Sequence, residues 1–266
     1  MRAGRAAVAV ALIILLTALT QTGGLALLLA MAIRRWLNRA ALSRAAMLPL
    51  LFLAVHGALS LAAVPLARLG GRVPLSCGIF ADPGYAPNTR LTCLLNRHYA
   101  TVTARQAIED AAAVLRNGGG ETLYYLDAGF PFFDGFPMLP HLSHRGGTAV
   151  DFAIAWVDAA GRPVPSPSPI GYFAYAAPDA GEGASCPGSA SWRRWDLAAL
   201  QPLFASYRFD VAGTRRAVEG LLATGAVRRI FVEPHLKHRL GLDDARLRFQ
   251  GCRAARHDDH LHVEFR

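Results

Sequence analysis

Two short stretches of the chain concentrate the residue types that bind metal ions. The first reads HLSHRGGTAVD over residues 141–151, and the second reads HDDHLH over residues 257–262. Imidazole nitrogens and carboxylate oxygens are the ligands that zinc and similar metals prefer, and a catalytic zinc site uses three protein ligands plus an exchangeable water. Two histidines and one aspartate would supply that set, so the two stretches together predict a catalytic metal site.

The spacing within each stretch indicates how its side chains would converge. Residues at i and i+2 of a strand share a face, so His260 and His262 would point into one cleft. A Gly-Gly turn at 146–147 would let the chain fold back and bring His144 toward Asp151. One of the two strand histidines could then bind the metal while its neighbour transfers protons.

The elements that position these stretches begin after a strongly apolar N-terminal segment. Residues 6–33 and residues 45–67 carry no charge, and each run is long enough to cross a bilayer as a helix. The connecting segment, 34–44, holds four arginines, which predicts that it stays in the cytoplasm. We therefore expect a membrane anchor over 1–67, with one or two transmembrane helices, and an extracytoplasmic domain over 68–266. With two spans the N-terminus would also lie outside.

The four cysteines all follow this apolar segment, at positions 77, 93, 186 and 252. An even number of cysteines in a domain beyond a membrane is typical of an oxidising compartment. Three pairings are possible. We favour Cys77–Cys93 with Cys186–Cys252, because the first pair closes a short loop that contains proline and glycine.

The outer domain is predicted to be α+β, with a small, mainly antiparallel sheet flanked by helices and long loops. Gly161 to Gly188 is rich in Gly, Pro, Ser and Ala, which is typical of a long loop. Composition and periodicity predict helices at 101–119, 213–226 and 234–240, and strands at 121–129, 147–157, 228–232 and 259–265.

The charge balance favours some partners over others. Lys and Arg number 28 against 19 Asp and Glu, a formal net charge of +9. Such a surface suits an anionic polymer or a membrane. Nucleic acid is not expected, because no basic helix or aromatic and basic platform recurs along the chain.

The two histidine stretches resemble the motifs of a known group of zinc peptidases, which includes lysostaphin-type enzymes, D-Ala-D-Ala peptidases and the Hedgehog signalling domain. The chain is most similar to the penicillin-insensitive murein endopeptidase family, over roughly its second half. The shared features are a His-x-Ser-His-x-x-Gly-x-x-x-Asp segment at 141–151, an Arg-Ile-Phe-Val-x-Pro segment at 229–234, and a closing His-x-x-His-x-His-Val at 257–263.

The resemblance implies a role for each of these residues. The zinc ligands would be His144, Asp151 and His262, and His260 would be the catalytic histidine beside the metal, accompanied by His257. By the same resemblance His141, Ser143 and Asp127 would line or shape the site. For Asp258 and Asp259 the residue types leave two interpretations: they would accept hydrogen bonds from the site histidines, or they would be solvated turn residues.

The resemblance also implies a reaction. We expect zinc-dependent hydrolysis of peptide bonds in peptidoglycan cross-links, by a domain on the outer face of the inner membrane. Two alternatives share the same motifs. One is a D-Ala-D-Ala carboxypeptidase with the same zinc centre, and the other is a non-enzymatic, zinc-containing module that binds the cell wall.

Overall fold

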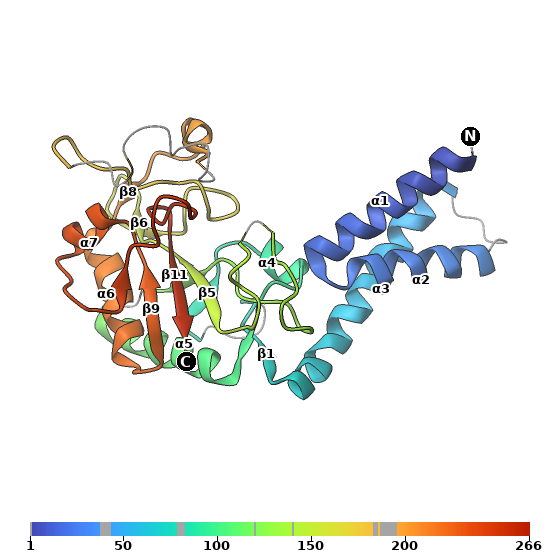
Figure 1. The fold of residues 1–266 in the computed structure, drawn as a ribbon, viewed down its shortest axis with the longest axis horizontal. Coiled ribbons are helices and arrows are strands. Elements are labelled where there is room, and N and C mark those ends of the chain that lie inside the picture. The colour runs from blue at the N-terminus through green and yellow to red at the C-terminus, as the bar shows by residue number, and fades with distance from the viewer. Residues whose placement is uncertain are drawn as a thin grey trace.

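The structure is a computed structural model that describes residues 2–37, 44–78, 83–119, 121–139, 141–182, 186 and 196–266. It has mixed α and β secondary structure. Three N-terminal helices form a unit that projects from the domain holding the strands (Figure 1).

The projecting unit consists of α1 (Arg2–Thr20), α2 (Gly23–Trp36) and α3 (Arg44–Ala67). The first apolar run, 6–33, is therefore not one helix, as a single span would require. Gln21 has a φ of 65°, in the left-handed region, and the chain reverses there between α1 and α2. The polar residues and glycines at 21–24, QTGG, interrupt the apolar run at this break.

Glycines make the tight reversal possible. A Cβ built on Gly24 would lie 2.0 Å from Oγ1 of Thr17, and one on Gly23 would lie 2.6 Å from Oγ1 of Thr20. The Thr20 hydroxyl instead accepts a hydrogen bond from the Gly23 amide at 2.7 Å. As a result the start of α1 and the end of α2 lie at the same end of the unit, away from the domain (Figure 1).

One helix in the described part of the chain, Ala46–Gly70, is long and apolar enough to cross a membrane, with a mean hydropathy of 2.1. The helix Gly4–Thr20 is apolar but shorter. Length and composition thus make Ala46–Gly70 a possible span.

The helical unit also touches the domain beyond the expected boundary at residue 67. Ala63 and Ala67 of α3 are fully buried in a small cluster with Tyr99. Three polar contacts join the two parts: His56 Nε2 with Leu94 O at 2.9 Å, Asn96 Nδ2 to Thr22 Oγ1 at 3.0 Å, and the Phe132 amide to Gln21 Oε1 at 2.8 Å. The unit is therefore packed against the domain rather than joined to it by a free linker.

The main sheet has six strands. In spatial order they are β10 (Leu247–Arg248), β9 (Val227–Phe231), β11 (His260–Phe265), β5 (Ala149–Ala153), β4 (Leu123–Tyr125) and β2 (Tyr85–Pro87). The three central pairings are antiparallel, and both edge strands pair in parallel.

Two helices, α5 (Val102–Gly119) and α6 (Val211–Ala223), pack against each other and contribute to the main core. Val150 and Phe152 of β5 belong to that core, together with Leu261 and Val263 of β11. Because strand side chains alternate between faces, the residues between them point to the opposite face of the sheet. Asp151 and His262 are among these, so the alternation places the candidate site on the face away from the core.

The remaining elements are short: η1 (Arg68–Gly70), β1 (Arg72–Pro74), α4 (Leu91–Leu94), β3 (Tyr99–Thr101), β6 (Trp156–Val157), β7 (Pro163–Val164), η3 (Ala198–Leu203), β8 (Arg208–Phe209) and α7 (Pro234–Leu240). The expected strand at 121–129 is limited to β4, and the one at 147–157 is interrupted between β5 and β6. The described part of the 161–188 loop contains only the two-residue β7 as regular structure.

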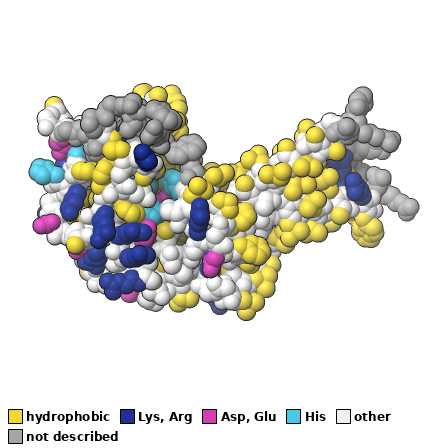
Figure 2. All heavy atoms as spheres, viewed as in Figure 1, with side chains coloured by type: hydrophobic (Ala, Val, Ile, Leu, Met, Phe, Trp, Pro, Cys, Tyr) yellow, Lys and Arg dark blue, Asp and Glu magenta, His cyan; other side chains and the backbone are white. Residues whose placement is uncertain are grey.

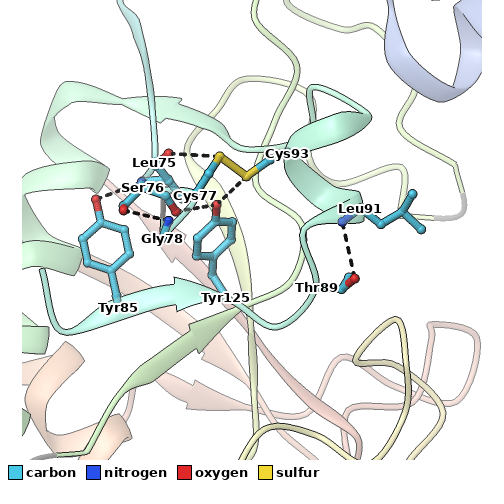
Figure 3. Close-up of a disulfide and its surroundings, with 9 residues drawn as sticks. All are labelled: Leu75, Ser76, Cys77, Gly78, Tyr85, Thr89, Leu91, Cys93 and Tyr125. Carbon is cyan, nitrogen blue, oxygen red and sulfur yellow. Dashed lines mark hydrogen bonds between the residues drawn. A yellow bond between two sulfur atoms is a disulfide. The ribbon is translucent and has the colours of Figure 1, made fainter. Parts of the chain in front are cut away.

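Both predicted disulfides, Cys77–Cys93 and Cys186–Cys252, are present. The first joins the segment after β1 to α4 (Figure 3). Tyr125 of β4 approaches it, with its hydroxyl 3.5 Å from Sγ of Cys93, and donates to the Ser76 carbonyl at 2.9 Å. The disulfide thus links α4 and the segment after β1 to each other beside strand β4 of the main sheet.

Candidate metal centre

The centre is built on the ladder between β5 and β11. His262 lies opposite Asp151 in this antiparallel pair, and its Nδ1 is 2.7 Å from Oδ1 of Asp151. His260, two residues earlier, lies on the same face opposite Ala153. His260 and His262 therefore share one face of β11, as their i, i+2 spacing predicted. The paired strand β5 supplies the Asp151 carboxylate.

His144 reaches the same carboxylate from the turn that precedes β5. Its Nδ1 donates to the Ala128 carbonyl at 2.6 Å, which fixes the ring and leaves Nε2 directed at Asp151. The turn needs glycine at Gly147, which has a φ of 69°. Gly129 packs against this turn, and a Cβ on it would lie 3.2 Å from the Gly147 Cα and 2.8 Å from the Tyr99 carbonyl oxygen. The Gly-Gly turn thus acts as the sequence predicts.

The contact between His144 and Asp151 has the chemistry of a cation site. Nδ1 carries the hydrogen given to Ala128, so Nε2 of the neutral ring is a lone-pair acceptor 3.1 Å from a carboxylate oxygen. This Nε2 is buried and has no hydrogen-bond partner among the described residues. Two buried acceptors face each other, and a cation between them would satisfy both. A proton is the alternative: burial opposes charge on His144, but Asp151 outweighs it and raises the pKa.

His141 joins the group from the rim, with Nδ1 2.7 Å from Oδ2 of Asp151. The ligand atoms of His141, His144 and Asp151 all lie within 4.8 Å of one another, so these residues could hold a metal ion. Burial alone would raise the pKa of Asp151, but the surrounding imidazoles, His144 foremost, hold it well below its usual range. The carboxylate is therefore charged and ready to bind a cation.

His260 stands beside the carboxylate without touching it. Its Nε2 lies 3.8 Å from Oδ2 of Asp151, while Asp259 accepts a hydrogen bond from its Nδ1 at 2.6 Å. Burial lowers the pKa of His260, but Asp259 and Asp151 outweigh that effect and raise it to about 9. Asp259 also accepts the Phe173 amide at 2.6 Å, so it is itself held in place. Of the two neighbouring aspartates, Asp259 is the one that orients a site histidine.

His257 completes the imidazole cluster, with its ring centroid 4.9 Å from that of His260 and 6.0 Å from that of His262. Burial and these two neighbouring imidazoles lower the pKa of His257 well below its usual value. Phe231 of β9 stacks on His262 at 5.7 Å and forms an apolar floor. His257 is thus an uncharged imidazole that lines the site.

Sequence reasoning missed a tyrosine in the middle of the centre. The hydroxyl of Tyr172 lies 2.8 Å from Oδ2 of Asp151 and 3.1 Å from Oδ2 of Asp127. Arg97, also missed, binds Asp127 through Nη2 at 2.8 Å. Burial and the two carboxylates raise the pKa of Tyr172 well above its usual value. The hydroxyl therefore stays protonated and acts as a hydrogen-bond donor. Tyr172 lies in the long loop, where nothing in the pattern marked it.

Two predicted residues lie further out. Ser143 is exposed and lines the rim of the cleft. Asp258 is buried, but its carboxylate binds Arg256 at 2.6 Å rather than a site histidine. Asp258 therefore contributes charge near the centre but does not orient an imidazole as expected.

The centre opens into a cleft of about 260 Å³. Figure 2 shows histidine side chains in a hollow of the domain, with basic side chains on the adjoining surface. The cleft is lined by His141, Leu142, Ser143, Gln250, Arg253, Ala254, Ala255, His257, His260 and His262.

A second group of metal-binding residue types, Cys77, Cys93 and His98, lies close together elsewhere. Its two sulfur atoms are joined in a disulfide, so neither is a thiolate that could bind zinc. The histidine and aspartate cluster is therefore the better metal site.

No known family model matches the chain, and no curated protein matches it either.

Proposed function

We propose that the chain is a zinc-dependent peptidase that hydrolyses peptide bonds in peptidoglycan cross-links. One observation carries the proposal: His144 Nε2 and His262 Nδ1 both lie within about 3 Å of the Asp151 carboxylate, and His262 lines an open cleft. A structural zinc site would be closed, whereas this one adjoins space for a water and a substrate.

Zinc is the metal that suits this set of ligands. Two imidazoles and one carboxylate favour a borderline metal over calcium or magnesium, which prefer oxygen ligands throughout. His144, Asp151 and His262 would hold it, and His141 would support Asp151 from the rim. When bound, zinc would supply a water with a pKa near 7 and would polarise the scissile carbonyl.

His260 would move the proton. Its Nδ1 hydrogen is committed to Asp259, so Nε2 is the atom that accepts or donates toward the cleft. The pKa of His260 is raised to about 9, so at neutral pH its ring is protonated. It would therefore donate a proton to the leaving amine or stabilise the oxyanion, rather than act as the base.

The substrate class follows from the resemblance of 141–151 and 257–263 to murein endopeptidases and from the apolar helical unit. An enzyme held at the outer face of the inner membrane would meet peptidoglycan there. A hydrolase that lacks a nucleophilic serine would also be insensitive to penicillin, which acylates serine enzymes.

The proposal is tested with the purified full chain and cross-linked muropeptides. We expect the dimer to be split, penicillin to have no effect, and a zinc chelator to abolish cleavage until zinc is restored. Product analysis separates this from a carboxypeptidase, which would release free D-alanine and leave the dimer intact. A protein that binds one zinc but leaves every muropeptide unchanged would contradict the proposal.

A further inference from the structure

One wall of the cleft is made by residues that the proposed chemistry does not use. Gln250, Arg253, Ala254 and Ala255 line the side that faces the histidines. They belong to the irregular segment between β10 and β11. A substrate held over the metal centre would contact this wall.

The charge on this wall is not compensated within the described residues. Several other arginines of the domain are paired with carboxylates: Arg229 with Glu264, Arg246 with Asp244, Arg256 with Asp258 and Arg239 with Glu182. Arg253 differs, because it is exposed and no described carboxylate binds it. Its guanidinium is therefore free to bind an anion that enters the cleft.

The backbone that carries Arg253 is held in place. The preceding residue, Cys252, forms the disulfide with Cys186, and the Ala254 amide donates to the Gly251 carbonyl at 3.2 Å. Gly251 has a φ of 96°, a conformation that favours glycine. The turn and the disulfide therefore fix the backbone position from which the Arg253 side chain extends at the cleft wall.

We propose that Arg253, assisted by Gln250, forms a carboxylate-binding subsite of the cleft. The inference rests on the proposed function and narrows its substrate to peptides with a free carboxylate close to the scissile bond. Guanidinium binds carboxylate through two parallel hydrogen bonds, and the Gln250 amide can donate a third. The subsite would set which end of a cross-linked peptide enters the cleft.

The test compares a cross-linked muropeptide with the same compound after amidation of its carboxylates. Binding is measured to the zinc-loaded full chain carrying His260→Ala, so that turnover does not interfere, and cleavage is measured with His260 intact. We expect the free acid to bind about tenfold more tightly than the amide. Arg253→Gln should remove the preference, and Arg253→Lys should keep part of it, because lysine cannot bind bidentately.

Arg248→Gln is the matched control. Arg248 is exposed on the neighbouring strand and does not line the cleft, so its loss changes the net charge equally but should preserve the preference. Equal binding of acid and amide, no binding of either, or equal damage by Arg248→Gln would overturn the subsite. Selective binding that depends on Arg253 but without cleavage of any muropeptide would support the subsite and refute the peptidase.

Discussion

The hydroxyl of Tyr172 lies 2.8 Å from Oδ2 of Asp151, so a residue of the long loop holds the carboxylate on which the metal centre is built. The same hydroxyl lies 3.1 Å from Asp127, which Arg97 neutralises. The loop is thus tied to the centre through a buried polar network.

Removing that hydroxyl should weaken metal binding without unfolding the domain. Tyr172→Phe keeps the ring, which packs edge-on against His141 and His260, but removes one of the hydrogen bonds that hold Oδ2 of Asp151. We expect zinc affinity to fall about tenfold to a hundredfold, as is usual when a group that orients a ligand is lost. Competition with a chelator of known affinity measures it. Tyr207→Phe, at a half-buried tyrosine that does not line the cleft, is the control, and unchanged affinity in Tyr172→Phe would contradict this role.

The sequence predicted the convergence of His144, Asp151 and the β11 histidines because strand periodicity and a Gly-Gly turn are local properties. It could not predict Tyr172 or Arg253, since both lie in irregular segments that only the tertiary fold brings to the cleft. Likewise, α5, α6 and α7 follow from composition and periodicity. The break at Gln21 was not predicted, although the polar residues and glycines at 21–24 interrupt the apolar run there.

A buried histidine that does not contact the Asp151 carboxylate, His98, should make the protein sensitive to acid. Burial lowers the pKa of His98 from 6.5 to about 4. Between these values the unfolded chain binds a proton that the folded chain does not, so stability falls as the pH drops from 6.5 toward 4. The loss is on the order of 3 kcal/mol.

The measurement is the free energy of unfolding of wild type and His98→Phe from pH 7.5 to pH 4. The wild type should lose more stability across this range than the variant, whose phenylalanine cannot take up a proton in the unfolded state. Above pH 7 the ionisation of His98 should no longer affect the free energy of unfolding. Parallel curves for the two proteins would contradict the assignment.

The helical unit predicts the location of the N-terminus. The 19 residues of α1 extend about 28 Å, close to the thickness of a bilayer core. Arg5 and Arg34 lie toward the end of the unit that is remote from the domain, and such basic ends stay in the cytoplasm. The N-terminus should therefore face the cytoplasm, opposite to what two spans would give.

Fusions of reporter proteins to the full chain check this topology. A fluorescent protein at the N-terminus should fold and fluoresce, and alkaline phosphatase there should be inactive. A phosphatase at the C-terminus, the control, should be active. An active phosphatase at the N-terminus would restore the two-span topology.

The central claim is that His262 holds the metal while His260, two residues away on the same strand, moves the proton. Zinc content and muropeptide cleavage should be measured together for the full chain carrying His262→Ala or His260→Ala. The account predicts one zinc and no cleavage for His260→Ala, and loss of both zinc and cleavage for His262→Ala. Full zinc content in His262→Ala, or cleavage at the wild-type rate in His260→Ala, would contradict it.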